Sequence, residues 1–177
     1  MKILGILRHA KSDWTDIGLS DFDRGLNARG RKGAALMGQH IAGRGIRWDA
    51  AIASPAARVQ ETLAASGLGC DFAYDEALYL ADTGTLMDKL RALPPNAESA
   101  LLAGHNPGLH ELVFTLVGPD SENELFDAAA EKFPTAAFAV LELDIADWAD
   151  IGRGCGRLVH LARPRDLDPE LGPETVR

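Results

Sequence analysis

The chain has 177 residues, which is enough for one domain with a single hydrophobic core. Hydrophobic residues make up 46% and charged residues 25% of the chain, a globular average that excludes a disordered or fibrous protein. Its 26 acidic side chains outnumber the 18 basic ones and give a formal charge of −8. We therefore expect no binding to nucleic acid or to anionic membranes, and any anion-binding site must be local.

Two features of the sequence favour a cytoplasmic location. Cys70 and Cys155 stand alone without CxxC spacing, as is typical of a reducing compartment. The apolar run from Ile3 to Leu7 is too short for a signal peptide or a membrane span. A cytoplasmic enzyme is the default interpretation, although a non-catalytic module fits these bounds equally well.

The chain begins with a short apolar segment, Lys2 to Leu7, that predicts a buried strand ending at Arg8 and His9. Polar residues at 12–25 predict a loop, and Asn27 is a suitable cap for a helix that reaches about residue 42. The following segments predict a strand at 49–53, a helix at 55–66, a strand at 70–74, a helix at 83–93, a strand at 99–103 and a helix at 107–117.

This alternation predicts an α/β fold: a three-layer α/β/α sandwich with a mostly parallel central sheet. The last third breaks the pattern, since residues 135–143 and 156–162 both favour strands that pair antiparallel at an edge of the sheet. We expect one domain over residues 1–164. Residues 165–177, rich in proline and charge, are expected to form a loosely docked C-terminal tail.

Two histidines and two arginines are the candidates for chemistry. His9 and His105 each follow an apolar strand, at the sheet edge where ligands bind in open α/β sheets. Arg8 precedes His9, and Arg58 lies one turn into a helix that also starts at this edge. A single histidine here is more often structural and a single arginine more often solvated, but two guanidinium groups that converge on one place are suited to phosphate oxygens.

Three segments then carry a family resemblance: Arg8-His9-Ala10-Lys11-Ser12, residues 54–62 (Ser-Pro-Ala-Ala-Arg-Val-Gln-Glu-Thr) and Gly104-His105-Asn106-Pro107. In this order they resemble the signatures of the histidine phosphatase superfamily, and most closely the SixA-like phosphohistidine phosphatases. Residues 23–30, 78–79 and 133–135 support the resemblance, which covers about residues 1–164 and implies a phosphoglycerate mutase-like fold. Ala10 stands where the superfamily usually has glycine, and alanine there requires a backbone φ below zero.

The resemblance implies a phosphatase in which His9 is the nucleophile and forms a covalent phosphohistidine that water then hydrolyses. Arg8, Arg58 and His105 would hold the phosphoryl oxygens. Ser12 and Asn106 are further candidates for phosphate contacts, and Asn106 is also expected to cap the helix that follows it.

The general acid is the least defined part of this mechanism. Glu76 and Asp82, after the third strand, are the candidates, and Asp13 is a more remote one. A phosphohistidine substrate relaxes the need for an acid, because imidazole is a better leaving group than an alkoxide. We therefore expect the partner to be a phosphorylated protein or a small phosphorylated metabolite, bound in an open pocket. The sequence specifies no oligomeric state.

Three other interpretations compete. A zinc site could use His9, His40, His105, His110 and His160, but no HExxH or comparable spacing is present, and we expect neither a metal nor a cofactor. A phospho-ligand binding module could use the same pocket without turnover. A phosphomutase could return the phosphoryl group to its substrate, which calls for a more closed pocket.

Overall fold

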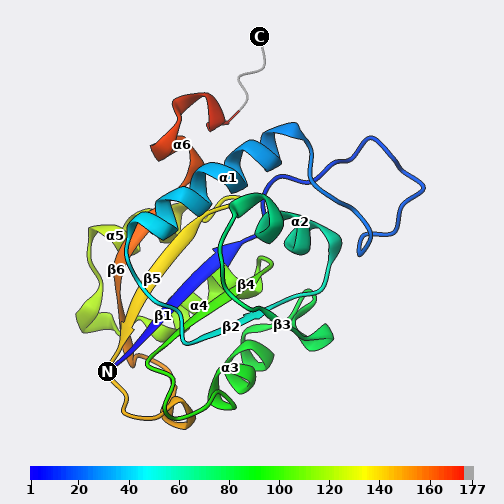
Figure 1. The fold of residues 1–177 in the computed structure, drawn as a ribbon. Coiled ribbons are helices and arrows are strands. Elements are labelled where there is room, and N and C mark those ends of the chain that lie inside the picture. The colour runs from blue at the N-terminus through cyan, green and yellow to red at the C-terminus, as the bar shows by residue number, and fades with distance from the viewer. Residues whose placement is uncertain (174–177) are drawn as a thin grey trace.

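The computed structural model describes residues 1–173, which form a six-stranded sheet between two layers of helices (Figure 1). The strands are β1 (Lys2–Arg8), β2 (Ala50–Ala53), β3 (Ala73–Tyr74), β4 (Ser99–Gly104), β5 (Phe138–Leu143) and β6 (Gly156–Ala162). The helices are α1 (Ala28–Gly43), α2 (Ala57–Ser66), α3 (Thr83–Arg91), α4 (Gly108–Leu116), α5 (Glu124–Glu131) and α6 (Pro164–Leu167).

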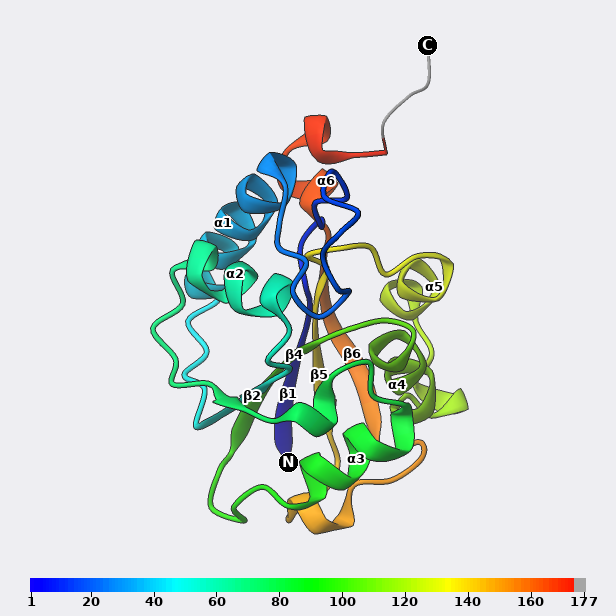
Figure 2. The same cartoon turned by 90° about the vertical axis from the view of Figure 1, so that its right-hand side faces the viewer.

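The helices divide between the two faces of the sheet. Figure 2 shows α1 and α2 on one face and α3, α4 and α5 on the other. The side chains of β1 alternate between the two resulting cores: Leu4 and Ile6 pack with α3, α4 and α5, whereas Leu7 packs with α1 and α2. A strand buried on both faces is apolar throughout, which is why this segment was recognisable in the sequence. The predicted three-layer sandwich is confirmed.

The sheet is parallel on one side of β1 and antiparallel on the other. Its strand order is β3-β2-β4-β1-β5-β6. Strands β1 to β4 run parallel, while β5 pairs antiparallel with both β1 and β6, as predicted. Arg8 is level with Gly104, and Ala53 is level with Ala103. The residues that follow β1, β2 and β4 therefore emerge together at one edge of the sheet.

Helix starts show where local sequence signals hold and where they fail. The Asn27 side chain accepts a hydrogen bond from the Gly30 amide (2.8 Å) and caps α1, as predicted. The helix expected from residue 55 begins two residues later, at Ala57, and the helix expected from residue 107 begins one residue later, at Gly108. Neither helix has a side-chain cap among the described residues. The peptide bond between Asn106 and Pro107 is cis. The expectation that Asn106 caps α4 is therefore wrong, because its side chain is directed elsewhere.

The segment after β6 packs closely against α1. Arg29 donates hydrogen bonds to the carbonyls of Glu170 (2.9 Å) and Gly172 (2.8 Å), and Lys32 pairs with Asp168 at 2.9 Å. Residues 165–173 of the predicted tail are thus held by specific contacts rather than loosely docked. Residues 174–177 of that tail lie outside the described residues.

Within residues 1–173, no helix combines the length and the apolar character that are needed to cross a membrane. The longest, α1, has 16 residues.

Close packing of α1 against α2 gives a test of the fold. A Cβ atom at Gly38 would lie 1.9 Å from the Ser66 carbonyl oxygen. We expect Gly38→Ala to lower the free energy of unfolding by about 1–3 kcal/mol, because the two helices must move apart. Urea denaturation monitored by circular dichroism measures this change. Gly43→Ala, in the same helix with nothing within 4 Å of its Cβ, is the control and should be neutral or stabilise by up to ~1 kcal/mol. Equal destabilisation by both substitutions would contradict the packing.

Candidate active site

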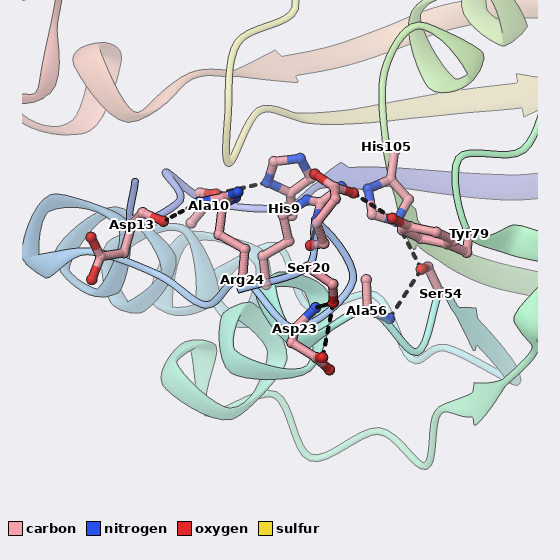
Figure 3. A network of polar contacts seen from close by, with 12 residues as sticks. His9, Ala10, Asp13, Ser20, Asp23, Arg24, Ser54, Ala56, Tyr79 and His105 are labelled. Atoms are coloured by element: carbon pink, nitrogen blue, oxygen red, sulfur yellow. Dashed lines mark hydrogen bonds and ion pairs between the residues drawn. The ribbon is translucent and has the colours of Figure 1, made fainter. Parts of the chain in front are cut away.

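Strand register brings His9, Ser54 and His105 together at the edge of the sheet (Figure 3). The His9 amide donates to the Gly104 carbonyl (3.1 Å), and the Ser54 amide donates to the Ala103 carbonyl (3.1 Å). These bonds continue the β-ladder by one residue beyond each strand. The two imidazole rings lie with their centroids 5.3 Å apart. The structure thus brings the two predicted histidines together.

His9 is held as a neutral imidazole of defined tautomer. Its Nδ1 lies 2.8 Å from the Ala10 carbonyl oxygen, which only accepts hydrogen bonds, so Nδ1 carries the proton and Nε2 has the free lone pair. Burial lowers the pKa of His9 to about 4, and the charges of Arg8 and Arg58 act in the same direction. At neutral pH the ring is therefore uncharged and nucleophilic at Nε2.

Ala10 adopts the negative φ that an alanine requires, since it is not among the residues with positive φ. Its amide donates to the Thr62 hydroxyl at 2.9 Å, and that hydroxyl donates to the Arg58 carbonyl at 2.6 Å. Helix α2 therefore fixes the backbone that positions His9.

His105 is oriented by Ser54. Its Nε2 lies 2.7 Å from the Ser54 hydroxyl oxygen, which also accepts the Ala56 amide (3.3 Å). The Ser54 hydroxyl serves equally as donor or acceptor toward Nε2, and the Nδ1 atom of His105 is buried without a hydrogen-bond partner among residues 1–173. Burial, and then the nearby His9, lowers the pKa of His105 to about 3. The ring is thus uncharged at neutral pH. The sequence placed Ser54 in the second signature segment, just before a predicted helix, but not against His105, because the two residues are 51 positions apart.

Two guanidinium groups line the same cavity as His9. Arg58, in the first turn of α2, donates to the Asp21 carbonyl at 2.8 Å and to the Asp21 carboxylate at 3.0 Å. Arg8 donates to the Phe133 carbonyl at 3.2 Å, and its buried Nε has no partner within the described part of the chain. Burial, and then the charge of Arg58, lowers the pKa of Arg8. This proximity of two positive charges favours an anion between them.

Asp21 is the residue that sequence reasoning missed. It belongs to the polar loop between β1 and α1 and lines the cavity with its carboxylate, which pairs with Arg58 and accepts a short hydrogen bond from the Tyr79 hydroxyl. The Tyr79 bond and then the Arg58 pair lower the pKa of Asp21. The only sequence signal was its place in a loop expected to cover this edge of the sheet.

The three predicted acid candidates do not line this cavity. Glu76 and Asp82 are exposed, and the Asp82 carboxylate accepts the Thr85 amide (2.8 Å) as the N-cap of α3. Asp13 accepts hydrogen bonds from the amide and hydroxyl of Thr15. The Asp13 and Asp82 carboxylates thus serve a local turn and a helix cap, and the carboxylate that lines the cavity among the described residues is that of Asp21.

Ser12 and Asn106, the further phosphate-binding candidates, have different positions. Ser12 is buried and lines the cavity. Asn106 does not line it. Its side-chain amide donates to the Phe133 carbonyl at 2.8 Å, the same oxygen that Arg8 contacts. Asn106 thus anchors the loop before β5 beside the site.

The remaining histidines lie in two other places. His40 and His160 contact each other through their Nε2 atoms at 2.7 Å, and His110 contacts the Ala129 carbonyl at 2.6 Å. Over the described range 1–173, no three histidine, cysteine, aspartate or glutamate side chains are grouped so as to hold a metal ion.

Comparison with known proteins identifies relatives of this chain. The family model of the histidine phosphatase superfamily (branch 1) matches residues 4–101. An uncharacterized protein of Mycobacterium tuberculosis is 35% identical over 160 residues, covering 90% of this chain and all of the relative. Among solved structures, a candidate phosphohistidine phosphatase SixA from Agrobacterium tumefaciens is 31% identical with a TM-score of 0.77, over 92% of this chain and 98% of that one. Another, from Nakamurella multipartitia, is 28% identical with a TM-score of 0.82, over 92% and 96%.

The lowered pKa values of His9 and His105 can be measured directly. Because burial disfavours the charged rings, we expect both imidazoles to stay neutral as the pH falls from 7 to 5.5, with midpoints near 4 and 3. An NMR titration of ¹⁵N-histidine-labelled protein in phosphate-free buffer reports the protonation and tautomer of each ring. The same chain in urea is the reference, where histidines titrate at about 6.5. Midpoints at that value in the folded protein would contradict the neutral pair.

Proposed function

Because this chain belongs to the histidine phosphatase superfamily and to its SixA-like branch, we propose that it hydrolyses a phosphoryl group through a covalent phosphohistidine on His9. The observation that carries this proposal is the neutral His9 ring, with a free Nε2 lone pair, in a cavity shared with Arg8 and Arg58. The substrate is phosphohistidine on a protein or a small phosphate ester.

In the first step the Nε2 lone pair of His9 attacks phosphorus, and the bond from phosphorus to the leaving atom breaks. The imidazole becomes positively charged as it forms the new bond, and the Ala10 carbonyl stabilises this charge through the Nδ1 proton. Arg8 and Arg58 neutralise the phosphoryl oxygens, and the uncharged His105 ring lies beside His9 with its centroid 5.3 Å away. Arg8 already lines the cavity beside His9, whereas Arg58 exchanges its contact with the Asp21 carboxylate for the phosphoryl group.

Asp21 is suited to protonate the leaving atom. In the free enzyme the hydrogen bond from Tyr79, and then the pairing with Arg58, lower the pKa of this carboxyl and keep it ionised. A phosphoryl dianion that binds Arg58 takes away this cationic partner and brings negative charge close to the carboxylate, and both changes raise its pKa. Asp21 thereby becomes able to hold a proton when substrate is bound.

In the second step a water molecule attacks the phosphohistidine, the bond between phosphorus and Nε2 breaks, and inorganic phosphate forms. Asp21, which gave its proton to the leaving group, accepts one from the attacking water. His9 returns to its neutral state, with its proton still on Nδ1. Water needs access to the phosphorylated ring for this step, and the exposure of Asp21 at the cavity is compatible with such access.

Replacing His9 tests the proposed intermediate. We expect His9→Ala to lose a ³²P-labelled, acid-labile phosphoenzyme and to reduce turnover of a phosphohistidine protein and of p-nitrophenyl phosphate by roughly 10³-fold or more, because the nucleophile is absent. Rapid quench with labelled substrate measures the first change, and phosphate release measures the second. The control is His110→Ala, whose ring contacts a carbonyl of α5 instead of the cavity. Equal turnover by wild type and His9→Ala would reject the mechanism.

The role of Asp21 is testable by varying the leaving group. We expect Asp21→Asn to reduce kcat for alkyl phosphates by about 10²–10⁴-fold, because an alkoxide must be protonated as it leaves. The loss on p-nitrophenyl phosphate should be much smaller, since its leaving group needs no proton. Asp23→Asn is the matched control in the same loop, where the carboxylate accepts only the Ser20 hydroxyl in the described structure. An equal loss on both substrates would show that Asp21 only positions Arg58.

A further inference from the structure

The cavity at His9 is larger than a phosphoryl group requires. Its volume is about 470 Å³. At ~30 Å³ for each water molecule, this space corresponds to roughly fifteen waters, and it lies in the range of about 300–1,000 Å³ that is usual for pockets that hold whole small molecules. A phosphoryl group, with four heavy atoms, fills only a small part of it. The rest of the cavity is available to the part of the substrate that carries the phosphoryl group.

This additional space is strongly basic, although the chain as a whole carries a charge of −8. The basic residues that line the cavity are Arg8, Lys11, Arg29, Arg58, Lys132 and Arg165. Among the described lining residues, Asp21 is the only carboxylate, and it is paired with Arg58. Arg8 and Arg58 belong to the phosphoryl site, so the other four basic residues extend the positive charge beyond what one phosphoryl group needs.

Two of these four basic residues, Lys132 and Arg165, form no ion pair with a carboxylate of residues 1–173. The acidic residues nearest to Arg165 in the sequence have other partners. Asp166 pairs with Arg163 at 3.1 Å and interacts with the charge of Arg165 only at longer range, and Asp168 pairs with Lys32 at 2.9 Å. Two positive charges without an ion-pair contact among residues 1–173, in one concave surface, favour an anionic ligand.

The basic side chains are carried by elements that are fixed relative to His9. Lys132 directly precedes Phe133, whose carbonyl is held by Arg8 and Asn106. Arg165 lies in α6, where Pro164 packs 3.8 Å from the place that a Cβ of Gly33 would occupy. Both side chains therefore start from backbone that is anchored to the site. An anion bound by them would lie at a defined place in the same cavity as the phosphoryl group.

We propose that Lys132 and Arg165 form a second anion subsite, which binds a carboxylate or a further phosphate group of a small phosphate ester whose phosphoryl group lies at His9. This inference rests on the proposed phosphatase function and narrows its substrate class to small molecules with two anionic ends. The exposed Trp14 ring also lines the cavity, with the Arg24 guanidinium 3.8 Å from its centroid. The indole ring offers a flat surface against which the bound molecule can pack, and its fluorescence reports binding in the cavity.

Matched pairs of substrates test the subsite. Carboxyalkyl phosphates with two to five methylene groups are compared with alkyl phosphates of the same length. We expect Arg165→Gln and Lys132→Gln each to lower kcat/KM for the best carboxyalkyl phosphate about tenfold, mainly through KM, because a charge-assisted hydrogen bond is lost. Turnover of the alkyl phosphates should change less than about twofold, since they do not reach the subsite.

Arg153→Gln is the matched control, because it removes the same charge from an exposed position in the connection between β5 and β6, at the opposite end of the sheet. It should leave both substrates unaffected. An equal change on both kinds of substrate in the Arg165 and Lys132 variants would overturn the proposal. Impaired dephosphorylation of a phosphohistidine protein, with unchanged turnover of the carboxyalkyl phosphates, would also overturn it, since the basic residues would then bind an acidic protein surface.

A binding measurement separates this inference from the proposed function. Tryptophan fluorescence, from which the Trp14 contribution is identified by comparison with a Trp14→Phe variant, is titrated with inorganic phosphate and with an alkane diphosphonate, which cannot be hydrolysed. We expect the wild-type protein to bind the diphosphonate at least about tenfold more tightly, and the Arg165→Gln and Lys132→Gln double variant to lose this preference while it retains phosphate binding. This result would support the subsite even if the protein turned over no phosphate ester. A preference that persists in the double variant, or no preference in the wild type, would overturn it.

Discussion

Hydrogen bonds between the parallel strands β2, β4 and β1 keep Ala53 level with Ala103 and Arg8 level with Gly104. The next residue along each strand then enters the site, and the His9 and Ser54 amides extend the same ladder. Groups that are almost one hundred residues apart in the chain meet because this register is fixed. A shift of one strand by a single residue would turn its following side chain to the other face of the sheet and dismantle the site.

The site depends equally on keeping its imidazoles uncharged. Two rings with centroids 5.3 Å apart, beside two arginines, are buried where an added proton is strongly disfavoured. Each ring has one nitrogen committed to a protein partner, the Ala10 carbonyl or the Ser54 hydroxyl. The committed nitrogen determines what the other can do. The Ala10 carbonyl leaves His9 with a lone pair on Nε2, whereas the Ser54 hydroxyl orients the His105 ring.

The sequence predicted those features that depend on local pattern. The apolar run of β1 and the Asn27 cap were recognisable because strand burial and capping involve residues next to each other in the chain. Asp21 was not recognisable, because its role is set by Arg58 and Tyr79, which lie 37 and 58 residues away. Asp82 was selected from its place after the third strand, yet its oxygen is used to cap α3. Ser54 and Asn106 look like helix caps in the sequence, but both have partners from distant elements.

Asp21 holds both terminal nitrogens of Arg58, Nη1 through its backbone carbonyl and Nη2 through its carboxylate. In the proposed reaction, an incoming phosphoryl group displaces the carboxylate from Nη2, and after hydrolysis the same carboxylate competes with inorganic phosphate for the guanidinium. Ground-state binding of every phosphate is weakened by the strength of this internal pair, whether the phosphate belongs to substrate or product. The loop between β1 and α1 thus supplies a carboxylate that competes with phosphate for Arg58. In the proposed reaction, this replacement of bound phosphate by the Asp21 carboxylate shortens the time for which product remains bound.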